Sequence, residues 1–217
     1  MIANICFHGI GTIIREREPG EARYWVTEGS FLRILDELRE NPRVRLSFDD
    51  GNASDASVAL PALLERGLQA TFFALAGRRD DAASLSPADL RELRGAGMQI
   101  GSHGWEHVPW RGLSDAEARR ELIDARTALV EASGGPIDDA ALPLGRYDRR
   151  LLARLRQARY RTVYTSDRLP ARPTSHIQAR YSVTALDTAE SVRSLVEHRP
   201  GIRDLRNLAA SAVKRLR

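Results

Sequence analysis

The 217-residue chain is predicted to fold as an α/β protein with a parallel sheet. Short apolar runs alternate with amphipathic stretches of helical period along the whole chain. Four polar clusters each follow an expected strand, which is where parallel α/β folds gather their functional groups. These two observations predict βαβ units with one shared site. Because no repeat or long linker divides the sequence, we expect a single domain over residues 1–217.

The expected strands are short apolar runs, and they cover residues 2–7, 44–48, 70–76, 98–101, 140–142, 162–165 and 180–183. The expected helices cover residues 30–38, 55–66, 86–96, 114–132, 149–159, 188–197 and 202–216. Ser30 is the expected N-cap of the first helix, and Ser114 opens a capping box with Glu117. A long loop is expected between the first strand and the first helix.

Composition excludes several protein classes. The single cysteine, Cys6, cannot form an internal disulfide, and no apolar run approaches the roughly 20 residues of a membrane span. The first residues lack the basic and apolar regions of a signal peptide, so a cytoplasmic location is expected. The net charge is +4, but arginines are interleaved with Glu and Asp as on solvated helix faces. No nucleic-acid partner is therefore expected.

The last expected helix carries an apolar stripe, formed by Ile202, Leu205, Leu208, Ala209, Ala212, Val213 and Leu216. Such a stripe is typical of a helix on a membrane surface and also of a helix packed on its own protein. We favour the second interpretation, so membrane association is not the expected outcome. The oligomeric state is left open by the sequence.

Asp49 and Asp50 end the expected strand 44–48 and precede Gly51. Acidic residues before glycine are common in turns. Here, however, the strand would carry both carboxylates to the mouth of a buried sheet, where two adjacent like charges repel each other. A bound cation would relieve that repulsion.

His103 and His107 lie four residues apart, a spacing that serves one metal ion on a helix and also occurs between unrelated surface imidazoles. Gly104 and Pro109 favour a loop or a single turn here. One Asp with two His suits a catalytic divalent metal that keeps open positions for water and substrate. The second carboxylate would then accept a proton from the water.

The segments that carry these residues resemble motifs of the polysaccharide deacetylases, the NodB-homology or carbohydrate esterase 4 family. Residues 47–51 (Ser-Phe-Asp-Asp-Gly) resemble the first motif, and residues 102–107 (Ser-His-Gly-Trp-Glu-His) resemble the second. Residues 142–148 are similar to the form of the third motif found in members that handle exopolysaccharides. The resemblance covers residues 40–170 and implies a distorted, TIM-like (β/α)7 barrel.

The resemblance also implies roles for individual residues. Asp49 would be the general base, and Asp50, His103 and His107 would hold a divalent metal ion, commonly Zn²⁺ although other divalent ions occur. The backbone N–H of Leu144 would help to hold the oxyanion. The other candidate substrate-binding residues are Trp105, which could stack on a sugar or close the barrel mouth, and Arg146.

The sequence departs from the family pattern at three points. Ala141 stands where many members have an arginine that orients the base, and Asp167, in the region of the fourth motif, therefore lacks its usual partner. No clear match exists for the fifth motif, which supplies the general acid; residues 195–198 come nearest but are expected to be helical. His8 is the candidate substitute acid, and a structural hydrogen bond is its alternative role.

We expect a metal-dependent hydrolase that removes N- or O-acetyl groups from a saccharide, polysaccharide or precursor, and so cleaves a non-peptide carbon–nitrogen bond or an acetyl ester. One alternative is a catalytically impaired, metal-binding scaffold of a polysaccharide assembly. Another is an amidase for a small non-sugar amide. A non-haem iron oxygenase uses the same ligand types, but the alternation of strands and helices disfavours it.

Overall fold

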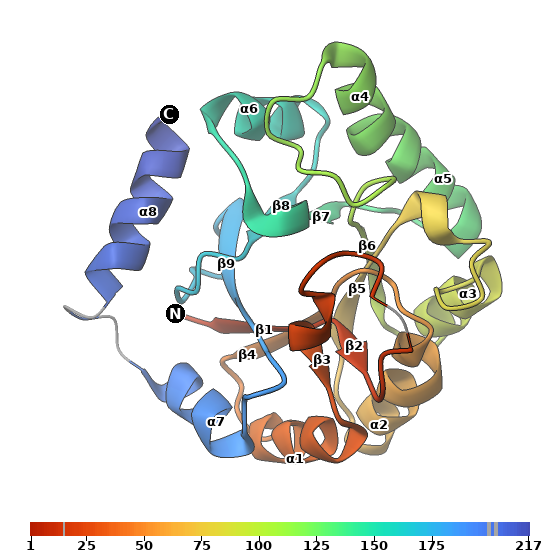
Figure 1. The fold of residues 1–217 in the computed structure, drawn as a ribbon, viewed down its shortest axis with the longest axis vertical. Helices are drawn as coiled ribbons and strands as arrows, with labels where there is room; N and C mark the ends of the chain where they lie inside the picture. The colour runs from red at the N-terminus through yellow and green to blue at the C-terminus, as the bar shows by residue number, and fades with distance from the viewer. Residues whose placement is uncertain (15, 199–200, 202–203) are drawn as a thin grey trace.

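Seven parallel strands form a closed barrel at the centre of the protein (Figure 1). The computed structural model describes residues 1–14, 16–198, 201 and 204–217. The barrel strands, in their order around the barrel, are β1 (Ala3–Phe7), β4 (Val44–Phe48), β5 (Ala70–Ala74), β6 (Gln99–Ser102), β7 (Asp139–Ala141), β8 (Thr162–Thr165) and β9 (Ile177–Ser182). Strand β9 pairs with β1 and closes the circle. The expected seven-stranded (β/α) barrel is thus confirmed.

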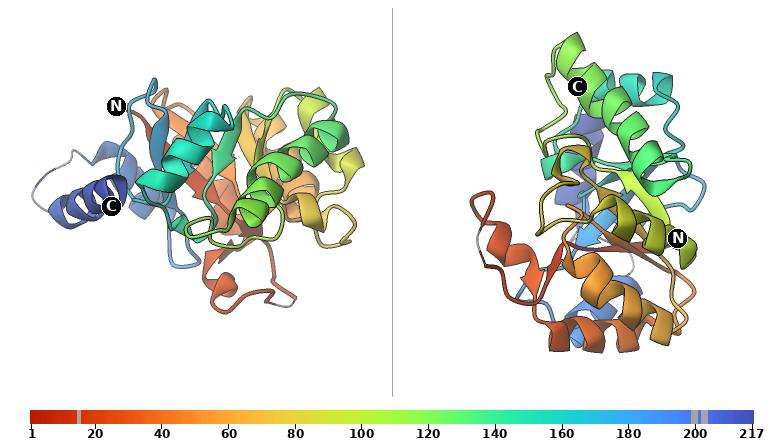
Figure 2. Two further views of the ribbon diagram at one scale, coloured as in Figure 1. Left: turned by 90° about the horizontal axis from the view of Figure 1, so that it is seen from above. Right: turned by 90° about the vertical axis from the view of Figure 1, so that its right-hand side faces the viewer.

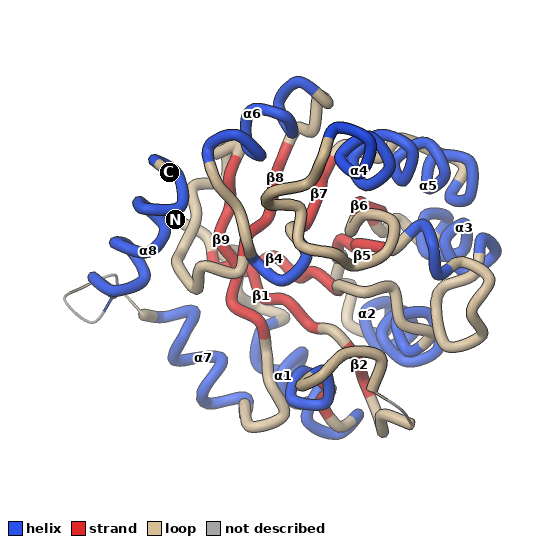
Figure 3. Tube along the Cα trace, turned by 45° about the horizontal axis from the view of Figure 1, so that its top comes forward, coloured by secondary structure: helices blue, strands red, loops and turns tan. Residues whose placement is uncertain are grey.

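Helices surround the strands on the outside (Figure 3). They are α1 (Glu28–Leu38), α2 (Leu60–Glu65), α3 (Pro87–Gly95), α4 (Asp115–Arg119), α5 (Ala125–Ser133), α6 (Arg149–Gln157), α7 (Ala189–Glu197) and α8 (Leu205–Leu216). Two π-helical turns interrupt this ring, at Asp55–Ala59 before α2 and at Arg120–Asp124 between α4 and α5. Such turns widen the helix locally and are frequent at functional sites.

Side-chain alternation along the strands separates a dry outer layer from the barrel interior. Phe7, Phe48 and Phe72 are register partners on the neighbouring strands β1, β4 and β5. Their rings stack on one another, with centroids 5.5 and 4.6 Å apart. Phe31 of α1 packs edge-on against Phe7 at 5.1 Å. This aromatic layer joins α1 to the first strands, and the other side of each strand faces the barrel interior.

Most predicted element boundaries are confirmed to within a few residues, including the capping box of Ser114 with Glu117. The expected N-cap of the first helix is wrong. Thr27, and not Ser30, caps α1, and its hydroxyl oxygen accepts from the Ser30 backbone N–H at 3.2 Å. The helix therefore starts one turn earlier, because the extended backbone at Thr27 places its oxygen over the first free N–H groups.

The expected long loop after β1 contains secondary structure of its own. Strand β2 (Gly9–Ile10) pairs in parallel with β3 (Trp25–Val26), and a 3₁₀ turn, Glu21–Tyr24, precedes β3. Gly9 permits this pairing, because a Cβ there would lie 2.1 Å from the Trp25 ring. The segment between the two strands projects from one end of the barrel (Figure 2).

The prediction that the apolar stripe of α8 packs on the protein is wrong. Leu205, Leu208, Ala209, Ala212, Val213 and Leu216 are exposed, and Ile202 lies outside the described residues. The opposite, polar side of the helix faces the body. There the buried carboxylate of Asp167 accepts from Lys214 Nζ at 2.7 Å and from Ser211 Oγ at 3.0 Å. Asp167 therefore anchors this helix instead of serving the site.

Within the part of the chain that the structure describes, every helix is too short or too polar to cross a membrane.

Candidate active site

The four polar clusters of the sequence meet in one pocket at the carboxyl ends of the barrel strands. Asp49 and Asp50 follow β4, His103 follows β6, and Leu144 follows β7. The pocket is lined by His8, Glu18, Pro19, Gly20, Glu21, Tyr24, Asp49, Asp50, Arg78, His103, His107, Leu142, Leu144, Gly145, Ser166, Arg180 and Ser182. This is the edge at which parallel barrels place their catalytic groups.

Asp50, His103 and His107 turn their donor atoms toward a common point. Oδ1 of Asp50 lies 3.4 Å from Nε2 of His103 and 3.3 Å from Nε2 of His107. Both imidazoles use their other nitrogen elsewhere. Nδ1 of His103 donates to the Ala141 carbonyl at 2.9 Å, and Nδ1 of His107 donates to the Glu18 carboxylate at 2.5 Å.

These outer hydrogen bonds fix the tautomers. A carbonyl and a carboxylate only accept, so each Nδ1 carries a proton, and the Nε2 lone pair is the one that each ring can offer to a metal. Two lone pairs and one carboxylate oxygen then converge, and the Asp50 Oδ1 atom is buried without a hydrogen-bond partner among the described residues. Atoms bound to one tetrahedral metal at ~2.0–2.1 Å lie roughly 3.3 Å apart, so the donor set fits a divalent ion.

The pKa shifts of His103 and Asp50 also favour a cation at this point. Burial alone would lower the pKa of its imidazole, but Asp49 and Asp50 together raise the pKa above its usual value. Burial would likewise raise the pKa of the Asp50 carboxyl, yet the surrounding imidazoles hold it well below the usual range. The site therefore favours a positive charge between Asp50 and the two histidines.

Backbone strain marks the same residues. Asp50, His107 and Leu144 adopt the left-handed conformation, with φ of 74°, 59° and 55°. For residues other than glycine this region costs on the order of 1 kcal/mol or more, and it persists where surrounding contacts impose it. The strain turns the Asp50 carboxylate and the His107 ring toward each other and places the Leu144 backbone at the pocket wall.

Asp49 is held by Arg180, which enters from β9. Nη1 and Nη2 of Arg180 donate to the two carboxylate oxygens of Asp49, each at 2.6 Å, and Nη1 also donates to Ser47 Oγ at 3.1 Å. The guanidinium lies over the rings of Phe73 and Tyr164, 5.2 and 5.6 Å from their centroids. Such a bidentate pair fixes both the position and the rotation of the carboxylate.

This pair corrects the expectation that the base lacks an orienting arginine. Ala141 does replace the arginine of the third motif, but Arg180 reaches the same carboxylate from a different strand. The Ala141 carbonyl serves His103 instead. Burial would raise the pKa of Asp49, and Arg180, His103 and His8 outweigh burial and lower it. Asp49 is thus an ionised, oriented carboxylate whose Oδ2 lies 3.9 Å from His103 Nε2.

A buried glutamate shapes the loop that carries both histidines. Glu121, in the second π-helical turn, accepts from the backbone N–H groups of Trp105 and Glu106 at 2.8 and 3.2 Å. It also accepts from Trp110 Nε1 at 3.1 Å. A loop without secondary structure of its own is therefore fixed by one charged acceptor, which holds His107 within reach of Asp50.

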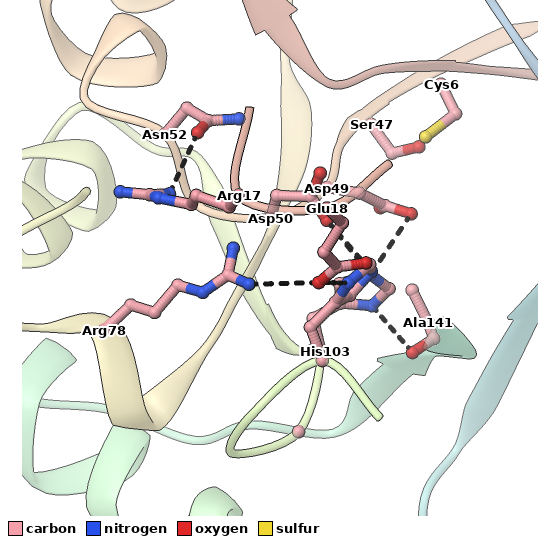
Figure 4. Close-up of polar contacts among 12 residues, drawn as sticks. Cys6, Arg17, Glu18, Ser47, Asp49, Asp50, Asn52, Arg78, His103 and Ala141 are labelled. Atoms are coloured by element: carbon pink, nitrogen blue, oxygen red, sulfur yellow. Dashed lines mark hydrogen bonds and ion pairs between the residues drawn. The ribbon is translucent and has the colours of Figure 1, made fainter. Parts of the chain in front are cut away.

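The segment between β2 and β3 contributes further residues to the pocket wall. Glu18, which supports His107, is itself held by Arg78 at 3.2 Å (Figure 4). Tyr24 stacks on the His8 ring, with centroids 4.8 Å apart. Burial lowers the pKa of His8, so its ring is neutral near pH 7. His8 Nδ1 is buried and has no partner in the described part of the chain, and the ring has a nitrogen within 4.8 Å of an Asp49 carboxylate oxygen.

The structure brings most of the predicted site residues together. Asp49, Asp50, His103, His107, His8 and Leu144 all line the pocket, whereas Trp105 and Arg146 do not. Trp105 packs against Gly77, where a Cβ would lie 2.8 Å from its ring, and under the Arg120 guanidinium. Arg146 is exposed outside the pocket. The geometry thus suits Trp105 for closing the barrel mouth, the second of its two expected roles.

Three residues that shape the site were not identified from the sequence: Arg180, Glu18 and Glu121. Each acts on a residue that lies far away along the chain, and arginine and glutamate are common on surfaces in this composition. The best available signal was Arg180, a charge within the expected strand 180–183, since a charged residue in a buried strand needs a partner.

Comparison with known proteins places the chain among deacetylases. The sequence profile described as polysaccharide deacetylase matches residues 37–163. YxkH of Bacillus subtilis, a protein named as a polysaccharide deacetylase, is 24% identical over 140 residues, which make up 64% of this chain and 50% of that protein. The peptidoglycan-N-acetylglucosamine deacetylase PgdA of Listeria monocytogenes is 30% identical over 99 residues, 45% of this chain and 20% of that protein.

Among solved structures, the Streptococcus pyogenes deacetylase PplD in complex with acetate superposes with a TM-score of 0.78 at 20% identity, covering 91% of this chain and 98% of that one. At this identity the likeness concerns the fold. The chain spans half or less of the length of the two curated relatives named above.

Metal binding is tested by removing ligands one at a time. We expect the protein to bind one equivalent of Zn²⁺, and Asp50→Ala or His103→Ala to weaken that binding by at least about 100-fold, because each removes a direct donor. His176→Ala is the control, since His176 lies outside the pocket. Titration against a chromophoric chelator measures the affinity. Equal Zn²⁺ affinity in the wild type and Asp50→Ala would contradict the assignment.

The Asp49–Arg180 pair is tested by a double-mutant cycle. Arg180→Met leaves Asp49 buried without its partner, so we expect the free energy of unfolding to fall by about 3–5 kcal/mol. Adding Asp49→Asn to Arg180→Met should recover part of that loss. Urea denaturation gives the values. Arg119→Met, which removes an exposed arginine from its pair with the exposed Asp124, should cost about 1 kcal/mol or less. Strictly additive losses in the double variant would rule out the coupling.

Proposed function

The chain belongs to the polysaccharide deacetylase family, and on that premise we propose that it is a metal-dependent hydrolase that removes acetyl groups from a saccharide or saccharide precursor. One observation carries the proposal. An oriented, ionised carboxylate, Asp49, lies beside a separate set of two imidazoles and a carboxylate in the same pocket. Hydrolysis of an acetyl group by direct attack of metal-activated water uses both parts, a proton acceptor for the water and a positive centre for the carbonyl oxygen.

Asp50, His103 and His107 would hold the ion, with Zn²⁺ the first choice and other divalent ions also compatible with this donor set. Bound there, a divalent cation would polarise the acetyl carbonyl and lower the pKa of water in its reach. The chain prepares the site for it, because Ala141 and Glu18 keep the Nε2 lone pairs of the two histidines turned inward.

Asp49 is the proposed general base. Arg180 engages both of its oxygens and so leaves the remaining lone pairs to accept a proton from the attacking water. The lowered pKa keeps Asp49 ionised across the neutral range. The Arg180 guanidinium also stabilises the ionised form of Asp49 beside an ionised Asp50. Asp49 can therefore act as the base while Asp50 acts as a metal ligand.

Leu144 and His8 are the proposed groups for the rest of the reaction. The strained backbone at Leu144 lines the pocket, and we propose that its N–H donates to the developing oxyanion, a contribution typically of a few kcal/mol. Because His8 is neutral near pH 7, we propose that it passes to the departing nitrogen or oxygen the proton that Asp49 takes from the water, while the hydroxyl of that water ends in the released acetate. Among the described residues, it is the pocket imidazole outside the proposed ligand set.

An N-acetylated sugar is the proposed substrate class. The relative PgdA is named for N-acetylglucosamine of peptidoglycan, and a Pestalotiopsis relative, 33% identical over 89 residues, is named a chitin deacetylase. The scaffold alternative rested on the missing arginine of the third motif and on the lack of an evident histidine of the fifth motif, and Arg180 weakens the first of these reasons. A small non-sugar amide stays a second candidate, because attack by water serves any amide.

The base is tested by Asp49→Asn. We expect acetate release from N-acetylated chito-oligosaccharide to fall by at least about 1,000-fold, because the amide cannot accept the proton. Zn²⁺ stoichiometry should stay at the wild-type value, since Asp49 is outside the proposed ligand set. An enzymatic acetate assay and elemental analysis provide the two readouts. Full activity in Asp49→Asn would exclude this base, and absence of turnover by metal-loaded wild type on a broad panel of acetylated sugars would favour the scaffold.

The acid is tested by His8→Gln. We expect kcat for an N-acetyl substrate to fall by about 100-fold or more, because an amine is a poor leaving group without a proton. An activated acetyl ester, whose leaving group needs no proton, should lose far less. His198→Gln, on the outside of the barrel, is the control. Equal losses on the two substrates would assign His8 a structural role.

A further inference from the structure

Helix α8 presents an apolar face to solvent. Leu205, Leu208, Val213 and Leu216 are 58, 44, 58 and 80% exposed, and Ala209 and Ala212 fill the strip between them. The helix lies at the outer edge of the barrel, on the side away from α3 and α5 (Figure 1). An exposed apolar strip of this continuity on one element marks an interaction site.

The outward orientation of this strip is imposed by contacts on the other side of the helix. Ser211 is buried, and its hydroxyl group lies within hydrogen-bond distance of both Asp167 and Tyr147. Lys214 donates to Asp167 at 2.7 Å and reaches the Gly145 carbonyl at 3.4 Å. These bonds hold the polar side of α8 on the body, so the apolar side cannot turn inward without breaking them.

The charged side chains of α8 itself are all positive. Residues 205–217 include no Asp or Glu, and the exposed Arg206 and Arg215 flank the strip on its two sides. Helix α6, which packs against α8, adds the exposed Arg149, Arg150 and Arg156. An apolar strip between arginines is the pattern of a helix that lies in the headgroup region of a bilayer.

We propose that α8 docks the protein on an anionic lipid bilayer, with its apolar strip among the upper acyl chains and its arginines at the phosphates. Charge decides between the possible occupants. A second copy of this chain would bring two arginine-flanked strips together, and they would repel each other. A bilayer also suits the strip's shape, since the central alanines offer no large side chain to fill a protein pocket, whereas lipid adapts to any apolar surface about 18 Å long.

The inference goes beyond the proposed function and connects to it through Gly145. This residue lines the pocket, and Lys214 links α8 to it. Docking through α8 would therefore hold the pocket beside a membrane, where an acetylated saccharide attached to a lipid is concentrated. Membrane binding itself does not depend on the reaction.

The experiment is co-sedimentation of the full chain with vesicles of phosphatidylcholine alone or mixed with phosphatidylglycerol, at low and high salt. We expect binding to the mixed vesicles that weakens with salt. Leu208→Glu/Val213→Glu should abolish it. Arg206→Gln/Arg215→Gln should weaken it about 30-fold, because each basic residue near an anionic surface contributes about 1 kcal/mol.

Matched controls lie across the barrel. Leu64→Glu changes an exposed leucine of α2, and Arg91→Gln/Arg119→Gln changes two exposed arginines of α3 and α4. Both controls should bind as the wild type does. Arg206→Gln/Arg215→Gln keeps the test decisive should Leu208→Glu/Val213→Glu fail to fold.

Three results would overturn the proposal: no binding of the wild type to the mixed vesicles, equal losses in the controls, or a dimer by light scattering that Leu208→Glu/Val213→Glu dissociates. Hydrolysis of a soluble acetylated oligosaccharide should be unchanged in all α8 variants. Wild type that binds vesicles but hydrolyses no acetylated sugar would sink the proposed function and leave the docking surface standing.

Discussion

Two adjacent carboxylates at the mouth of a buried barrel are the constraint on which the site depends. Asp49 and Asp50 are both almost fully buried, and in such a setting two like charges cannot both stay ionised unless each is compensated. The chain compensates them differently. Asp49 receives a fixed guanidinium from Arg180, whereas Asp50 and the Nε2 atoms of two imidazoles converge on one point, where a bound cation would compensate the charge of Asp50. Because only Asp50 is left with an open donor set, the two neighbours acquire separate chemistry, one suited to a proton and one to a cation.

The position of Arg180 follows from the geometry of a closed parallel barrel. Strands β7 and β9 lie on either side of β8, and their interior positions face the same central space. A guanidinium on either strand can therefore reach the carboxylate after β4. The backbone carbonyl of Ala141 lies 2.9 Å from His103 Nδ1. An arginine that orients Asp49 is therefore present on a different strand, and its guanidinium lies over the rings of Phe73 and Tyr164.

How much the sequence could predict depends on the range of each interaction. The strands and most of the helices follow from period and caps, which are local. The expectation that Asp50 meets His103 and His107 rests on their positions after strands of one parallel sheet and on the family resemblance. Glu18, Glu121 and Arg180 were missed because each acts across the fold: nothing near residue 180 indicates that it meets residue 49.

The orientation of α8 was predicted wrongly for a related reason. The stripe shows that the helix has two unlike faces, but a distant residue, Asp167, decides which face meets the body.

The observed orientation of α8 reflects two opposing contributions to the free energy. Turning α8 inward would bury four large apolar side chains, each contributing roughly 1.5–3 kcal/mol when fully buried. It would also strip the buried Asp167 carboxylate of Lys214 and Ser211, and an uncompensated buried charge costs several kcal/mol. The bonds of Asp167 to Lys214 and Ser211 offset the free energy that burial of the apolar side chains would contribute. The helix can therefore keep its leucines exposed to water. The same apolar side chains stay available to another apolar phase. A bilayer supplies one without disturbing Asp167, and its phosphates meet the arginines that would oppose contact with a second copy. The anchor that holds α8 to the barrel is therefore also what keeps its binding face open.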